Sequence, residues 1–200
     1  ELMDGLGNFG PEPLMREAEP RSINAFEESV SGFVFKVQAN MDPKHRDRIA
    51  FMRICSGVFK RGMKAKNVRL ERDLKIANPM TFMAKTRTIT EEAYPGDIIG
   101  IHDTGLIKIG DTFTEGEMLH FTGIPSFAPE IFRRVRNLDP MKTKQLQKGL
   151  AQLSEEGAVQ LFKLPFTNQM ILGAVGILQF DVVKFRIQNE YSADCDYEPY

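Results

Sequence analysis

The chain of 200 residues, with 42% hydrophobic and 26% charged side chains, has the size and composition of one or two globular domains. Its formal net charge of −1 excludes a chain that attracts nucleic acid over its whole surface, so any such binding requires a local basic patch. No apolar run approaches the roughly 18 residues that span a bilayer, and no signal peptide opens the sequence, so we expect a cytoplasmic protein without a membrane partner.

The cysteines and histidines show no metal-ligand spacing. Cys55 and Cys195 lie far apart in the sequence, and His45, His102 and His120 are scattered. Neither a Cys-x-x-Cys pair nor a mixed His/Cys cluster is present, so we expect no metal site. In a cytoplasmic protein, two such cysteines are predicted to be reduced thiols.

Residues 1–25 are predicted to be the end of a helix and a linker. The end of a helix is indicated in the first six residues, and the following stretch to Ser31 is rich in Pro, Gly, Glu and Asn. Pro11, Pro13 and Pro20 prevent a helix there. We therefore predict an extended linker, with the folded part of the chain starting after it.

Residues 26–123 show a series of short strand patterns. Residues 33–40 have the period-2 pattern of a half-buried strand, in which Phe33, Phe35, Val37 and Ala39 alternate with Val34, Lys36, Gln38 and Asn40. Turn signals such as Pro95-Gly96 separate the further strands that we predict, which are 48–56, 65–70, 74–76, 81–85, 88–94, 97–102 and 119–122. Many short strands without a long helix favour a closed or nearly closed β-barrel.

Residues 124–200 follow a different pattern, in which two helices alternate with four strands. Strands are predicted at 131–136, 158–164, 169–175 and 193–198. Asp139 and Pro140 are predicted to start the first helix, in which Leu146, Leu150 and Leu153 share one face, and Gly157 to end it. The second helix follows Gly176 and is predicted to have a wide apolar arc formed by Leu178, Phe180, Val182, Val183, Phe185 and Ile187. The order β-α-β-β-α-β predicts a ferredoxin-like α+β domain, so the fold class is mainly β plus α+β.

The sequence contains no complete catalytic or nucleotide-binding motif. Gly57 and Gly62 have the glycine spacing of a phosphate loop, but Met63 stands where Lys is required and Ala65 where Ser or Thr would bind magnesium. These glycines are better explained as turns of a hairpin. We recognise no catalytic triad and no carboxylate pair on one strand face, so we predict neither a catalytic residue nor a bound cofactor in this chain.

A basic stretch in the first half of the barrel is the best binding signal. Acidic residues gather later in that domain, so one side of it is expected to be positive. Our candidates for contact with RNA phosphates are Lys44, His45, Arg46, Arg48, Arg53, Lys60, Arg61 and Lys64. The alternative, which the sequence leaves open, is a solvated rim without a partner.

A second basic group lies on the first strand of the last domain. Arg134 and Arg136 are predicted to share one face of the strand, with Arg133 on the other. Aromatic side chains, which single-stranded RNA readers place on their central strands, are scarce there. We therefore predict that Arg133, Arg134 and Arg136 contact RNA backbone or a protein partner rather than bases.

Several segments of the sequence resemble bacterial peptide chain release factor 3, a family of translational GTPases. The resemblance covers nearly the whole chain and includes the run Asp-Pro-Lys-His-Arg-Asp-Arg at 42–48, which distinguishes this family from elongation factor G. The segments that carry it are 32–51, 93–100, 109–113, 121–132, 152–160 and 173–182.

The resemblance implies a fragment of a larger protein. It implies a translation-factor β-barrel, domain II, followed by domain III, and a full protein that uses GTP and Mg²⁺ to promote release of class I release factors from the ribosome. The implied partners are small-subunit ribosomal RNA, a ribosomal protein and the protein's own GTPase domain, with the class I release factor complex reached indirectly. The family's nucleotide domain is expected to be missing apart from the end of its last helix, within residues 1–6, so no family catalytic residue is carried over. Two alternatives are a structural arm that packs on the GTPase domain, and a fragment of an elongation factor G relative.

Overall fold

The computed structural model describes residues 2–39, 48–83, 86–167 and 169–200. Cα distances divide the chain into two compact units. The first unit comprises 1–35, 51–101 and 110–124, and the second comprises 36–50, 102–109 and 125–200. The predicted domain boundaries at 25/26 and 123/124 stay predictions.

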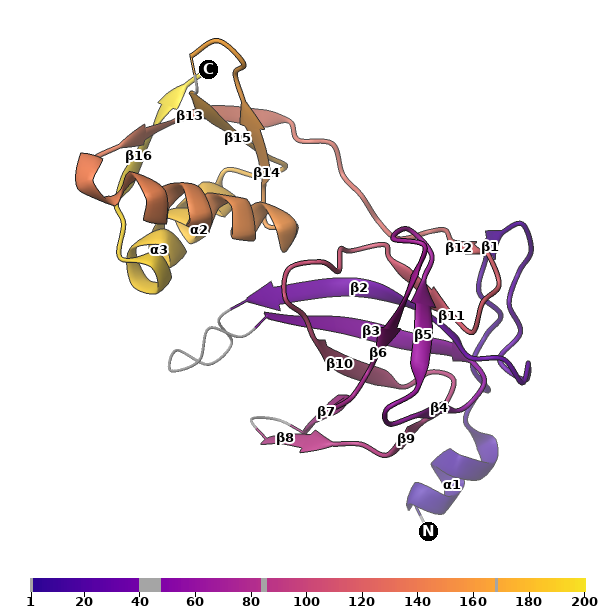
Figure 1. Ribbon diagram of the computed structural model, residues 1–200. Helices are drawn as coiled ribbons and strands as arrows, with labels where there is room; N and C mark the ends of the chain where they lie inside the picture. The colour runs from indigo at the N-terminus through magenta and orange to yellow at the C-terminus, as the bar shows by residue number, and fades with distance from the viewer. Residues whose placement is uncertain (1, 40–47, 84–85, 168) are drawn as a thin grey trace. The chain divides into compact units, whose positions relative to one another are not determined.

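An eight-stranded sheet forms the barrel, with the strand order β6-β5-β11-β2-β3-β10-β7-β8 (Figure 1). Its strands are β2 (Ser31–Ala39), β3 (Arg48–Ser56), β5 (Lys64–Asn67), β6 (Arg72–Lys75), β7 (Met80–Met83), β8 (Thr86–Ile89), β10 (Ile98–His102) and β11 (Thr112–Thr114). Two small sheets accompany it and pair β1 (Ala18–Glu19) with β12 (His120–Phe121) and β4 (Phe59–Lys60) with β9 (Glu92–Ala93). The predicted β-barrel fold is confirmed.

The barrel core is apolar because its strands turn aliphatic side chains inward. Val34 and Val37 of β2 and Ile54 of β3 are each at most 1% exposed. Val34 and Val37 lie three positions apart, so the alternation predicted for this strand breaks within it. Phe33 and Phe35 are only half-buried.

Several strand predictions in the barrel differ from the structure. The strand predicted at 65–70 ends at Asn67, where a turn begins, and β4 was not predicted. The stretch 88–94 was predicted as one strand, but β8 pairs with β7 while β9 pairs with β4. Thr90 separates them, since its backbone N–H donates to the Pro79 carbonyl and its hydroxyl to the Glu92 carbonyl. Strand β11 was not predicted, although all three of its residues are buried between β2 and β5.

The interpretation of the N-terminal segment as a linker that precedes the folded part was wrong for its second half. Helix α1 (Leu2–Phe9) has no buried residue, but Arg16 and Ile23 then form a β-bridge and β1 pairs with β12. Ile23 is 1% exposed and packs with Cys55, Leu119 and Phe121. Prolines exclude a helix here, but they do not prevent an extended segment from packing on the barrel.

The C-terminal part of the chain is the predicted ferredoxin-like domain. Its four antiparallel strands have the order β14-β15-β13-β16. The elements are β13 (Ile131–Asn137), the 3₁₀ turn η1 (Pro140–Lys142), α2 (Thr143–Glu155), β14 (Gln160–Lys163), β15 (Met170–Ala174), α3 (Leu178–Tyr191) and β16 (Cys195–Pro199). Both helices lie on the same side of the sheet (Figure 1).

The first of the two helices ends as predicted, but Asp139 and Pro140 start the 3₁₀ turn η1 and not α2, which begins at Thr143 without a side-chain cap. The Asp139 carboxylate accepts a hydrogen bond from the Met141 N–H at 3.0 Å, and Gly157 follows the helix with a left-handed φ of 78°. Leu146, Leu150 and Leu153 are completely buried against the sheet and α3.

The helix dipole disfavours acidic residues at the end of α2, and a tertiary contact explains why Glu156 is found there. The Glu156 side chain is only 6% exposed and accepts a hydrogen bond from Arg186 of α3 at 2.6 Å. Arg186 also donates to Glu190 one turn further along α3. The carboxylate therefore pairs α2 with α3, an ion pair that outweighs the unfavourable dipole.

Candidate functional site

The residues predicted to contact phosphates from the barrel have different environments in the structure. Lys44, His45 and Arg46 lie outside the described residues. Arg48 is 7% exposed, and its guanidinium donates to the Asp103 carboxylate at 2.7 Å and to the Ile107 carbonyl at 2.9 Å. A buried arginine whose donors are used in this way is poorly placed to meet a phosphate.

Two further candidates lie on different parts of the barrel. Arg53 is half-buried on β3. Arg61 follows β4 and is exposed, but it donates to the Glu91 carboxylate at 2.7 Å and to the Ala77 carbonyl at 3.2 Å. Arg61 therefore holds two loops together, and the positive charge it presents is largely balanced.

Lys60 and Lys64, in contrast, belong to an exposed basic surface. Both side chains are exposed, and the register of the β5–β6 hairpin places Lys64 directly opposite Lys75. Neither these three lysines nor Lys66 forms an ion pair within the described ranges, although the strand registers place Lys60 opposite Glu92 and Lys66 opposite Asp73. Like charges that face each other across a strand pair destabilise the hairpin, unless an anion neutralises them.

Sequence reasoning missed Lys75, because its role depends on the strand register. Glu71 adopts a left-handed φ of 52° at the turn of the hairpin, which sets β6 opposite β5. The segment 60–75 holds seven Lys or Arg against two Asp or Glu, a net charge of +5 in a chain whose net charge is −1. We call Lys60, Lys64, Lys66 and Lys75 the lysine surface.

The hairpin that carries the lysine surface is anchored to the barrel by a buried carboxylate. Asp111 is 2% exposed and accepts hydrogen bonds from Arg69 at 2.8 Å and from the Asn67 amide at 2.9 Å. Asn67 in turn accepts a hydrogen bond from the Leu70 N–H at 3.0 Å. Arg69, which belongs to the same basic stretch, thus has a structural role.

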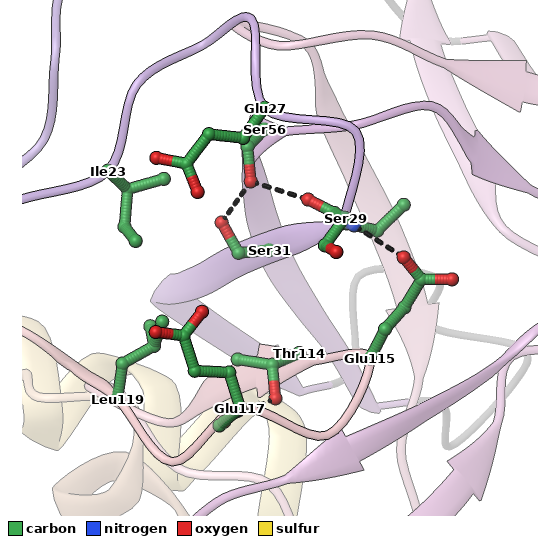
Figure 2. A pocket seen from close by; sticks show the side chains of 10 residues that line it. Ile23, Glu27, Ser29, Ser31, Ser56, Thr114, Glu115, Glu117 and Leu119 are labelled. Carbon is green, nitrogen blue, oxygen red and sulfur yellow. Dashed lines mark hydrogen bonds between the residues drawn. The ribbon is translucent and has the colours of Figure 1, made fainter.

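A small polar pocket lies between the N-terminal segment and the start of β2 (Figure 2). Its volume is about 60 Å³. The Ser31 and Ser56 hydroxyls lie 2.6 Å apart inside it, and Ser56 also donates to the Ser29 carbonyl at 2.8 Å. Three carboxylates, those of Glu27, Glu115 and Glu117, border the pocket.

These three carboxylates already have partners within the protein. Arg21 donates to both Glu27 and Glu117 at 2.8 Å, and Glu115 accepts from the Val30 N–H at 2.7 Å. Hydrogen bonds from Arg21 and from the Asn24 backbone lower the pKa of Glu27. Within the described residues, no group of three acidic, His or Cys side chains is arranged to hold a metal ion. We therefore assign this cluster, the Arg21 clamp, a structural role.

Burial of the cysteines outweighs the cations near them, which are Arg16 and Arg53 for Cys55 and Lys184 for Cys195. Both are buried free thiols. Burial raises the pKa of Cys55 to about 12, so its thiolate is scarce near neutral pH.

The second basic group lies on the central strand β13. The exposed residues Phe132 and Arg136 alternate with Val135, which is buried in the core, so Arg134 and Arg136 face away from the helices. Arg136 donates to Asp196 at 3.1 Å, whereas the contact of Arg134 with Glu198 measures 4.0 Å.

Family models match two consecutive parts of the chain. Residues 29–116 match the model for elongation factor G domain 2, and residues 121–200 match the model for the class II release factor RF3, C-terminal domain. The chain therefore carries a domain of the class II release factor RF3 family, preceded by a domain similar to elongation factor G domain 2. Neither of these two models describes a GTP-binding domain.

One solved structure supports the fold of this chain. The crystal structure of a protein from Thermus thermophilus matches with a TM-score of 0.71 at 22% sequence identity. The match covers 86% of this chain and 26% of that protein, so the chain spans about a quarter of that protein's length. None of the helices described is long and apolar enough to cross a membrane.

Proposed function

We propose that this chain is a ribosome-docking part of a translation termination factor. As in the family that it resembles, the whole protein would use GTP and Mg²⁺ in the cytoplasm to promote release of class I release factors from the ribosome. The partners of this part would be small-subunit ribosomal RNA and a ribosomal protein.

The lysine surface carries this proposal. Its four lysines are free of ion pairs among the described residues, and two of them face each other across a hairpin. Ribosomal RNA offers closely spaced phosphates that would neutralise such a surface. The match of the barrel to a translation factor domain supports the same partner.

An aromatic row on the barrel supports the alternative of a structural arm. The rings of Phe35 and Phe51 lie 6.5 Å apart and those of Phe51 and Phe82 lie 5.1 Å apart, and all three residues are half-exposed. Such a row is suited to packing against another domain, such as the GTP-binding domain of the whole protein. The match to elongation factor G domain 2 likewise leaves an elongation factor G relative as an alternative.

Ribosome sedimentation at a series of salt concentrations tests the docking proposal. A Lys60→Gln/Lys64→Gln/Lys75→Gln variant should bind bacterial ribosomes more weakly, with a salt slope reduced by about two to three because that many phosphate contacts are lost. A Lys142→Gln/Lys144→Gln/Lys148→Gln variant changes the net charge equally on η1 and α2 and should bind as the unchanged chain does.

The two hypotheses differ in what this experiment returns. If both variants lost ribosome affinity equally, binding would depend on the net charge of the chain and not on the lysine surface. Ribosome binding that is insensitive to salt and unchanged in the Lys60/Lys64/Lys75 variant would favour the structural arm. A separate Lys44→Ala/Arg46→Ala variant tests the remaining sequence-based candidates in the same assay.

A further inference from the structure

Two arginines from different segments lie beside the buried Cys55, and the first of them is Arg16. Its backbone forms a β-bridge with Ile23 through hydrogen bonds of 2.9 and 2.8 Å. Residues that face each other in such a bridge turn their side chains to the same side, and the side chain of Ile23 packs with Cys55. The Arg16 side chain therefore leaves the N-terminal segment on the side that faces β3.

The second arginine, Arg53, belongs to β3 itself. It stands two positions before Cys55, so the two side chains share one face of the strand. Burial has the largest effect on the pKa of Cys55 and raises it, whereas the charges of Arg16 and Arg53 both lower it. Charges act on a pKa in this way only from close by, so both guanidinium groups lie near the sulfur.

Neither guanidinium group has an acidic partner among the described residues. The Nε of Arg16 is shielded from solvent and has no acceptor, while the rest of this half-buried side chain makes no hydrogen bond or ion pair in the described ranges. The same holds for the half-buried Arg53. In contrast, Arg48, Arg61 and Arg69 each donate to a carboxylate.

The chemistry of the pair favours a phosphate group as its ligand. Two guanidinium groups close together repel each other, and an anion between them removes this repulsion. A planar carboxylate is satisfied by one guanidinium, which binds it through two parallel hydrogen bonds. A tetrahedral phosphate has more acceptor oxygens and can accept from two guanidinium groups at once.

We propose that Arg16 and Arg53 form a binding site for one phosphate group. Their Nη groups would donate to its oxygens, and the packing around the Arg16 Nε holds that guanidinium in place before the ligand binds. Free phosphate, a phosphate monoester and an RNA phosphodiester share this chemistry. The site has no residue in common with the lysine surface, so it does not depend on the proposed ribosome docking.

Titration of the 200-residue chain with inorganic phosphate at constant ionic strength tests the proposal, with NMR signals of the arginine Nε–H groups as the readout. We expect saturable shifts at Arg16 and Arg53 with a Kd on the order of 1 mM, as a ligand of a few atoms allows. Acetate, which offers a single carboxylate, should bind at least about fivefold more weakly.

Substitution of either arginine should weaken phosphate binding. Arg53→Gln should raise the Kd about tenfold, because a charged donor is lost, and Arg16→Gln should do the same from the other segment. Arg61→Gln is the matched control in the first unit, and it should change the Kd by less than about twofold because Arg61 is already bonded to Glu91. Spectra of the variants without ligand verify the fold.

The dinucleotide uridylyl-uridine, whose single phosphate is a diester, identifies the source of the phosphate. Binding at least as tight as that of inorganic phosphate would assign the site to a nucleic acid backbone, and clearly weaker binding would assign it to free phosphate or a monoester. The Lys60→Gln/Lys64→Gln/Lys75→Gln variant should bind phosphate as the unchanged chain does. Shifts that do not saturate, that persist in Arg53→Gln, that acetate reproduces at equal affinity or that disappear in the lysine variant would each overturn the proposal.

Discussion

Basic side chains that are close in the sequence serve different purposes in this protein. Arg48 is buried against Asp103, and Arg69 is bonded to the buried Asp111. Lys64, between them in the sequence, is exposed and faces another lysine. The sequence shows where positive charge is dense, but only the tertiary partners decide which cations are available to an anionic ligand.

The Arg21 clamp gives a pH dependence that can be tested with one substitution. Because hydrogen bonds in the folded state lower the pKa of Glu27 below its ordinary value, the ion pair stabilises the fold above the pKa of the unfolded chain. This contribution is lost as the pH falls through the folded-state pKa. Glu27→Gln should therefore cost about 0.5 kcal/mol in the free energy of unfolding at neutral pH, an amount typical of a partly exposed pair.

Urea denaturation at about pH 7 and about pH 3 measures this dependence, because Glu27 is protonated at the lower pH in the unfolded chain. The difference between Glu27→Gln and the unchanged chain should shrink at the lower pH. Glu17→Gln, on the same segment but with no side-chain hydrogen bond in the described structure, is the control and should show no such difference. A cost that is equal at both pH values would contradict the clamp.

Among the elements, the helix pair α2–α3 depends on a single glycine for its close approach. A Cβ added at Gly149 would lie 2.5 Å from Cδ1 of Ile187 and 2.8 Å from the ring of Tyr191. Ile187 is completely buried, so it has little room to move. The absence of a side chain at this position therefore sets the distance between the helices.

Gly149→Ala should destabilise the ferredoxin-like domain even though alanine is the better helix former. Overpacking costs about 1–3 kcal/mol, which outweighs the gain of about 1 kcal/mol in helix propensity. Thermal unfolding monitored by circular dichroism would report a lower Tm. Lys148→Ala, at the exposed neighbouring position, should leave the Tm nearly unchanged. A raised Tm for Gly149→Ala would show that α2 and α3 can move apart to accept the added methyl group.

The elements also show how far sequence patterns reach. Helix α2 was predicted with its buried leucines and its terminal glycine, because these signals are local, whereas the predicted cap residue Asp139 caps η1. The second helix was predicted with a wide apolar arc, but Phe180, Val183 and Ile187 are buried while Leu178, Val182 and Phe185 stay exposed. Composition does not show which apolar side of a helix meets the sheet.

The candidate surfaces were predictable only in part, for a similar physical reason. Arg134 and Arg136 share a strand face, as their spacing of two requires. Lys75 was missed because it joins the lysine surface through strand pairing with a distant partner. Pairing register depends on turn geometry and burial, which a single sequence specifies weakly.

Over the whole molecule, charge is unevenly distributed along the chain. The segment 60–75 carries +5 while the chain carries −1, so the remaining residues are acidic on balance. We therefore expect retention on heparin at low ionic strength despite a sequence pI of about 6.4.

The Lys60→Gln/Lys64→Gln/Lys75→Gln variant should elute from heparin at clearly lower salt, because the positive surface that contacts the polyanion is lost. The Lys142→Gln/Lys144→Gln/Lys148→Gln variant should elute near the unchanged chain. Equal shifts for both variants would mean that the polyanion responds to the net charge and not to the hairpin.

The packing of Ile23 over the barrel has a consequence for chemical reactivity. Ile23 covers Cys55 together with Leu119 and Phe121, and burial there keeps the Cys55 thiol protonated. A chain trimmed to begin at Phe26 would lack both Ile23 and Arg21, and the sulfur would face water. The N-terminal segment thus shields this thiol, and a thiol-specific dye would label the trimmed protein at Cys55 while the intact fold resists it.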